Sequence, residues 1–183
     1  HDILQFKKNC KISINCTKKY NTFIEEVIGT KVAYLNGCVD DYYDPYLNKI
    51  ISLADNANKK HIIVPFLFTQ SGIKPLTSVK MSERYVELFN RFKEADIIVV
   101  CGFGFNADDG HINGMFRELI QDYNKQITII HLAENGTYKE KNVKNYYRDQ
   151  LRLDSIDNIN IIPVNRERKD INKDEIWYNS LEL

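Results

Sequence analysis

The sequence has no excess of charge of one sign, because its 25 basic and 25 acidic side chains give a formal net charge of zero. Nucleic-acid binding normally requires a basic patch or stripe, and a charged membrane surface is recognised in a similar way. The nearest approach is the basic segment from Lys139 to Arg148, which acidic residues interrupt. We interpret it as a solvated helix face. Neither nucleic acid nor a membrane is therefore expected as a partner.

Long hydrophobic runs and paired cysteines are also missing. No apolar run approaches the ~20 residues of a membrane helix, and the chain does not open with a secretory signal segment. The four cysteines contain no C-x-x-C pair, which argues against a structural zinc site. Cys10 and Cys101 lie beside or within apolar segments, so we expect both to be small core residues of a reduced, cytoplasmic protein.

The remaining composition is that of an ordinary globular domain. Of the 183 residues, 43% are apolar and 27% charged, which is enough for a sizeable core and argues against general disorder. We find no internal repeat and no low-complexity linker, so we expect a single domain over residues 1–183. Because the chain begins with His1 and not with Met, we expect it to be a piece of a longer protein.

The first half of the chain predicts short elements. We expect strands at Lys11–Cys16, at Val32–Leu35 and from His61 to about Val64. The last of these should end near Val64, because Pro65 has no amide to donate to a sheet. We expect short helices at Tyr20–Val27, which Gly29 would end, and at Leu47–Leu53. A loop should follow over Thr69–Lys80.

The second half alternates between helical and strand patterns. Apolar residues recur at helical spacing after Ser82, at Tyr85, Leu88, Phe89 and Phe92. We then expect three strands, at Ile97–Cys101, Ile127–Leu132 and Ile159–Val164. A helix should follow each of them: one whose apolar side runs from Ile112 to Tyr123, then Val143–Leu153, then Asp174–Leu183. This order predicts an α/β fold with a three-layer parallel sheet and helices on both faces.

The best candidate site is the turn from Val100 to Asn113, since parallel sheets bind ligands where their strands end. Its glycines allow close approach of a ligand, its aromatic rings could pack against a base, and its polar groups suit ribose hydroxyls. The candidate residues are Gly102, Phe103, Gly104, Phe105, Asn106, Asp108 and Asn113. Other interpretations remain open: Asp108 or Asp109 caps the next helix, and the phenylalanines belong to the core. Gly-x-Gly alone is common in turns, and the full dinucleotide fingerprint is absent.

The segment Ala95–Asn113 resembles the late nucleotide-binding segment of bacterial sirtuin-like domains, with their pattern aDxxxvxGxsxxDxxIN. Two earlier segments are similar to motifs of that family in the same order: Lys18–Glu25 to TNYDxxxE and Val32–Gly37 to vxxLHG. Ile63–Pro75 falls where a substrate-facing loop would lie. The resemblance covers most of Lys11 to Val164. It implies a Rossmann-like fold of the zinc-less branch that binds NAD or ADP-ribose.

The sequence departs from that family at its catalytic positions. The opening strand and its Gly-Ala-Gly phosphate loop have no counterpart after His1. The asparagine of TNYD falls on Lys19 and the histidine of LHG on Asn36, whose amide cannot accept a proton at neutral pH. Asn15 would take the place of the TNYD asparagine only in a shifted alignment. His61 and His111 are the other histidines weighed as a base, and the catalytic residues stay unknown.

Three functions follow from these patterns. The first is a degenerate sirtuin-like module that binds NAD, ADP-ribose or a related nucleotide, and we rank it highest. The second is a structural or protein-interaction domain, for which tyrosines at 42, 43, 46, 146 and 147 would supply an interface. The third is an NAD glycohydrolase or deacylase completed by an upstream segment of the same protein.

Overall fold

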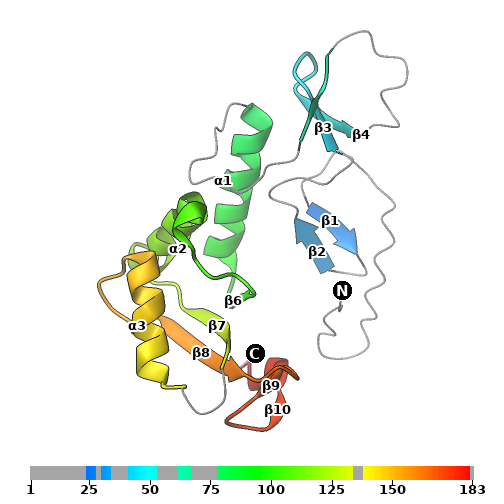
Figure 1. Ribbon diagram of the computed structural model, residues 1–183. Coiled ribbons are helices and arrows are strands. Elements are labelled where there is room, and N and C mark those ends of the chain that lie inside the picture. The colour runs from blue at the N-terminus through cyan, green and yellow to red at the C-terminus, as the bar shows by residue number, and fades with distance from the viewer. Residues whose placement is uncertain are drawn as a thin grey trace. The chain divides into compact units, whose positions relative to one another are not determined.

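The computed structural model describes residues 24–27, 30–33, 41–52, 62–66, 78–133 and 138–181. They fall into two compact units. The first contains strands β1 to β5 and helix α1 up to Glu87, and the second contains the rest of α1 and the described chain after it. Figure 1 labels these elements. The single domain expected from the sequence stays a prediction, and each unit is described by itself.

The first unit is built from short antiparallel strands. Strands β1 (Ile24–Val27) and β2 (Thr30–Ala33) pair with each other. Strands β3 (Asp41–Asp44), β4 (Lys49–Ser52) and β5 (Val64–Pro65) form a second sheet in the order β4-β3-β5. Pro65 is tolerated because β5 lies at the edge of this sheet.

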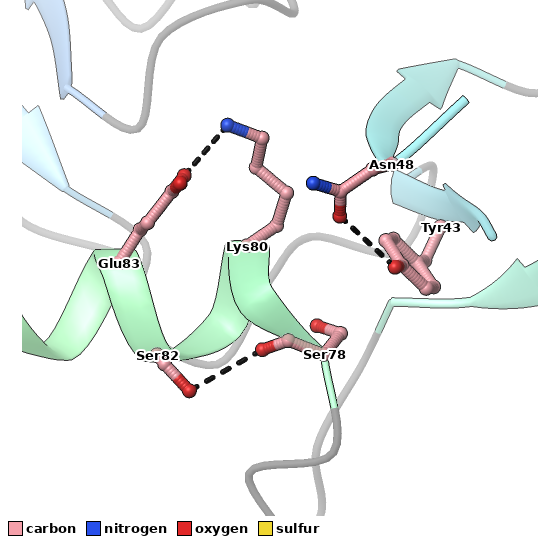
Figure 2. Close-up of polar contacts among 6 residues, drawn as sticks. All are labelled: Tyr43, Asn48, Ser78, Lys80, Ser82 and Glu83. Atoms are coloured by element: carbon pink, nitrogen blue, oxygen red, sulfur yellow. Dashed lines mark hydrogen bonds and ion pairs between the residues drawn. The ribbon is translucent and has the colours of Figure 1, made fainter. Parts of the chain in front are cut away.

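The predicted helices at Tyr20–Val27 and Leu47–Leu53 are wrong, since strands occupy the described parts of both. The hairpin between β3 and β4 shows why for the second. Asp44 Oδ1 accepts hydrogen bonds from the backbone N–H groups of Tyr46 (3.0 Å) and Leu47 (3.1 Å), which closes a turn. Asn48 adopts a left-handed φ of 49°, and Figure 2 shows its Oδ1 accepting from the Tyr43 hydroxyl at 3.0 Å. These side chains give the backbone an alternative to a helix.

The predicted helix after Ser82 is confirmed and begins one turn earlier, as α1 (Val79–Glu94). Figure 2 shows its first turn, where the Ser82 hydroxyl donates to the carbonyl of Ser78 and Lys80 pairs with Glu83 at 2.6 Å. Within the first unit, the buried guanidinium of Arg84 lies over the Phe66 ring at 4.5 Å. This contact packs the start of α1 against the strands.

The second unit confirms the α/β class. Strands β6 (Ile98–Cys101), β7 (Ile127–Leu132) and β8 (Ile159–Val164) alternate with helices α2 (Gly110–Gln121) and α3 (Glu140–Leu151). The three strands are parallel, and the sheet order is β10-β9-β8-β7-β6. Figure 1 shows α2 and α3 side by side against these strands. No helix in the described parts of the chain is long and apolar enough to cross a membrane.

The core of the second unit lies between the strands and the helices. Alternate strand residues face it, including Ile98 and Val100 of β6 and Ile127 and Ile129 of β7. The helices contribute Phe116, Leu119 and Ile120 from α2, and Tyr147 and Leu151 from α3. Strand β6 ends at Cys101, opposite Ile130, while β7 and β8 remain paired as far as Leu132 and Val164. The connection from β6 to α2 therefore begins beside the last residues of β7.

The predicted helix Asp174–Leu183 is wrong. The segment forms strand β10 (Glu175–Ile176), which pairs with β9 (Lys169–Asp170), and a short 3₁₀ turn at Trp177–Ser180. The buried carboxylate of Asp170 accepts from the Asn172 backbone N–H at 2.9 Å and from the Ser180 hydroxyl at 2.7 Å. Trp177 is 3% exposed. Tertiary packing of this segment therefore overrides its helical pattern.

Candidate functional site

The turn from Gly102 to Asn113, called the β6–α2 turn below, lies at the carboxyl edge of the parallel strands. The strands β6 and β7 end at neighbouring positions, with Cys101 paired to Ile130. The residues exposed there include Gly102, Gly104, Asn106 and Asp108. Cys101 is exposed as well, so its predicted place in the core is wrong: it occupies the last position of β6, where the helix-covered core has ended.

The backbone of the β6–α2 turn is strained at one residue. Gly102 has a φ of +70°, which glycine adopts freely, but Phe105 also has a positive φ of 53°. A bulky residue in this left-handed region costs about 1–2 kcal/mol and persists only where its surroundings hold it. Two sets of contacts hold Phe105, one to its ring and one to its carbonyl.

The ring of Phe105 is fully buried, with 0% of its surface exposed. Its centroid lies 5.0 Å from that of Phe103, 5.2 Å from Phe116 of α2 and 5.9 Å from Tyr147 of α3, all edge-to-face. Such pairs add about 0.5–1.5 kcal/mol each to the burial of apolar area. The Phe105 ring is therefore an anchor in the core and offers no face to a base.

The carbonyl contacts come from the side chain of Asn113 in the first turn of α2. Its Nδ2 donates to the carbonyl of Phe105 at 3.0 Å and to that of Asn106 at 2.9 Å. Because a carbonyl cannot donate, the amide orientation is fixed by these partners. The amide oxygen Oδ1 is buried and has no hydrogen-bond partner among the residues that the structure describes. Asn113 thus clamps the turn and leaves an acceptor unpaired.

The other predicted residues of the β6–α2 turn are closer to solvent. Phe103 is half-buried against the core, and Asn106 and Asp108 are exposed. A Cβ at Gly104 would lie 3.5 Å from Asn106 Oδ1, an ordinary contact. Asp109 is at the N-cap of α2 but makes no side-chain capping hydrogen bond.

The family's catalytic positions, Lys19 and Asn36, lie outside the described residues, and so does His61. His111 is half-buried in the first turn of α2. Among the residues that the structure describes, no three His, Cys, Asp or Glu side chains gather as a metal site would require.

A polar pair that the sequence analysis missed lies beside the turn. The Nδ1 atom of His131 is 3.0 Å from the hydroxyl of Tyr147, the residue whose ring also contacts Phe105. Burial lowers the pKa of His131 below its ordinary 6.5 and raises the pKa of Tyr147 above 10.0. The signal was available in the sequence, because His131 is the last residue but one of the predicted strand Ile127–Leu132.

Tyr138 stands on the other side of His131, with ring centroids 6.4 Å apart. Its hydroxyl is buried and has no hydrogen-bond partner in the described parts of the chain. Burial, and then the negative charges of Glu140 and Asp170, raise the pKa of Tyr138 to about 12. The imidazole of His131 at the carboxyl end of β7 and the phenols that contact it are therefore neutral, and they lie next to the β6–α2 turn.

Comparison of the chain with protein-family models, with curated proteins and with solved structures finds no match. The assignment of a function depends on the geometry of the turn.

Proposed function

We propose that the β6–α2 turn binds a nucleotide of the NAD or ADP-ribose type. The observation that carries this proposal is the unpaired acceptor Oδ1 of Asn113. A buried polar atom without a partner costs about 1–3 kcal/mol, so its presence in a clamped, strained turn calls for an explanation. A ligand that donates a hydrogen bond would supply the missing partner.

The chemistry of the turn favours ribose hydroxyls as those donors. Asn113 Oδ1 and the exposed carboxylate of Asp108 accept hydrogen bonds, and the exposed amide of Asn106 both donates and accepts. A ribose has two adjacent hydroxyls that can donate and accept in this way. Because Oδ1 is covered in the free chain, binding requires the irregular segment from Gly102 to Asn106 to shift.

The resemblance to bacterial sirtuin-like domains belongs to the same proposal. It would extend the observed parallel strands to a Rossmann-like, three-layer sheet without a zinc module, in which the chain binds its nucleotide without consuming it. The nucleotide would be the small-molecule partner, and an upstream part of the same protein would be the second. A cytoplasmic location is part of this proposal on the sequence evidence alone.

Calorimetric titration with ADP-ribose and with NAD tests the proposal. We expect saturable binding that Asn106→Ala and Asp108→Ala each weaken, by about three- to tenfold for the loss of one hydrogen bond of about 0.5–1.5 kcal/mol. The matched control is Asp122→Ala, which removes an exposed carboxylate at the opposite end of α2. It should bind as tightly as the wild type.

Two results would contradict the proposal. Absence of saturable binding at millimolar ADP-ribose and NAD would mean that the turn is not a nucleotide site in this chain. Binding that is unchanged in both variants, with the fold preserved, would place the nucleotide elsewhere.

A further inference from the structure

A line of aromatic contacts connects the β6–α2 turn to a titratable side chain. The ring of Phe105 touches Tyr147, with centroids 5.9 Å apart, and Tyr147 touches His131, with centroids 5.8 Å apart. Tyr147 is 6% exposed and so has little room to move independently of either neighbour. A change in the contact between His131 and Tyr147 is therefore expected to alter the packing of Phe105, which anchors the turn.

A neutral His131 can accept a hydrogen bond from the Tyr147 hydroxyl. His131 is the hydrogen-bond partner of the Tyr147 hydroxyl, at 3.0 Å from Nδ1. Burial keeps the phenol protonated and the imidazole neutral. A protonated hydroxyl can donate to Nδ1 in the tautomer that carries the imidazole proton on Nε2, and we take this arrangement as the neutral state.

Protonation of His131 reverses this bond. When Nδ1 takes a proton from solvent it becomes a donor, so the Tyr147 oxygen must accept and its own hydrogen must turn away. That hydrogen would then lose Nδ1 as its acceptor, and a positive charge would sit half-buried among aromatic rings. The contact that neutral His131 stabilises would thus become unfavourable in acid.

Among the residues that the structure describes, the groups around His131 do not offset that charge. From α3 it faces the phenol of Tyr147, and from the segment before α3 it faces the ring of Tyr138. Its neighbour on β8 is Pro163, which does not titrate. The carboxylates of Glu140 and Asp170 act on Tyr138, and burial alone accounts for the shift at His131.

We propose that the His131–Tyr147 pair is a pH-sensitive latch on the β6–α2 turn, closed when His131 is neutral and released when it is protonated. In the closed state Tyr147 holds Phe105 in the core and the turn in its strained shape. In the released state the turn relaxes. The latch does not require a ligand, and only its effect on binding depends on the proposed function.

NMR titration of the whole chain between pH 8 and pH 5 tests the latch. We expect the ring signals of His131 and the backbone amide signals of Gly102 to Asn106 to change with one shared midpoint below 6.5. His131→Gln, whose amide oxygen can accept from Tyr147 but does not titrate, should abolish the change in the turn. Tyr147→Phe keeps the ring against Phe105 and removes the hydroxyl, so it should reduce that change severalfold.

His111 is a second histidine, within the β6–α2 turn itself at the start of α2, and His111→Gln is the control for its titration. The turn signals should keep their midpoint in that variant. The latch is refuted if the turn signals do not change with pH, or if their change survives in His131→Gln. A full-sized change in Tyr147→Phe also refutes it.

The effect on binding is measured separately with ADP-ribose. We expect the dissociation constant to fall severalfold from pH 7.5 to pH 5.5 in the wild type, because the released turn no longer opposes the shift that uncovers Asn113 Oδ1, and to stay constant in His131→Gln. If ADP-ribose binds at neither pH, the proposed function fails while the NMR titration still decides on the latch. If it binds equally at both pH values while the turn signals titrate, the claim that the latch controls binding is wrong.

Discussion

Replacement of Asn113 by alanine tests the clamp on the β6–α2 turn. The substitution removes two hydrogen bonds, from Nδ2 to the carbonyls of Phe105 and Asn106. At a net value of about 1 kcal/mol each, their loss destabilises the second unit by about 2 kcal/mol. Alanine regains about 0.6 kcal/mol of helix propensity. Removal of the unpaired Oδ1 and exposure of the buried Phe105 carbonyl without its donor change the free energy in opposite directions, by about 1–3 kcal/mol each, and nearly cancel. We expect a net loss of about 1–2 kcal/mol in the free energy of unfolding.

Urea denaturation followed by tryptophan fluorescence measures this loss directly. Trp177 is the only tryptophan of the chain and is buried in the second unit, so its emission reports on the unit that contains Asn113. The matched control is Asn90→Ala, which replaces an exposed asparagine within α1 of the same unit. That variant should be as stable as the wild type or slightly more stable. If Asn113→Ala is no less stable than Asn90→Ala, Asn113 does not hold the turn.

Three further predictions concern the same unit. Gly102→Ala should lower the free energy of unfolding in urea by about 1 kcal/mol, because its φ is +70° even though the added Cβ meets open space. Gly114→Ala in α2 should raise that free energy by up to about 1 kcal/mol. Phe105→Ala should cost about 3–5 kcal/mol, since the ring is fully buried; a loss below 1 kcal/mol would show that it is not a core anchor. Tyr138 has a pKa of about 12 in the folded chain against an ordinary 10.0, so its stabilising contribution is present below pH 10 and is lost toward pH 12. Thermal unfolding should therefore show that Tyr138→Phe loses less stability than the wild type above pH 10, and equal losses would contradict this assignment.

The buried parallel strands could be predicted from the sequence because their residue pattern leaves little choice. Ile127–Leu132 and Ile159–Val164 have the predicted bounds. Both are rich in isoleucine, whose branched side chain fits a pleated surface buried on two faces. The helices between them follow from the spacing of their apolar residues.

The short elements could not be predicted in the same way. At Lys49–Ser52 a helical pattern competes with a hairpin that depends on Asp44 and Asn48 side chains acting on the backbone. Near the carboxyl end of the chain, the buried carboxylate of Asp170 accepts a hydrogen bond from the Ser180 hydroxyl, ten residues away, which stabilises a turn. Such contacts form only when the whole segment packs, and local periodicity does not contain them.

The turn that the sequence offers as the candidate site does lie at the end of a parallel strand, but the arrangement of its residues could not all be predicted. Whether the second aromatic of Gly-Phe-Gly-Phe faces solvent or core depends on the positive φ of Phe105, which the sequence does not disclose. Which end of the Asn113 amide pairs and which stays unpaired is determined only once the carbonyls of Phe105 and Asn106 are in place. His131 was missed because its partner Tyr147 is 16 residues away on another element.

The most direct test of the nucleotide site is an NMR titration of the isotope-labelled chain with ADP-ribose at neutral pH. We predict saturable shifts in the backbone amides of Gly102 to Asn106 and in the side-chain amide of Asn113, which must respond when Oδ1 gains a partner. The absence of saturable shifts, or shifts confined to residues away from the β6–α2 turn, would contradict the assignment of this turn as the nucleotide site.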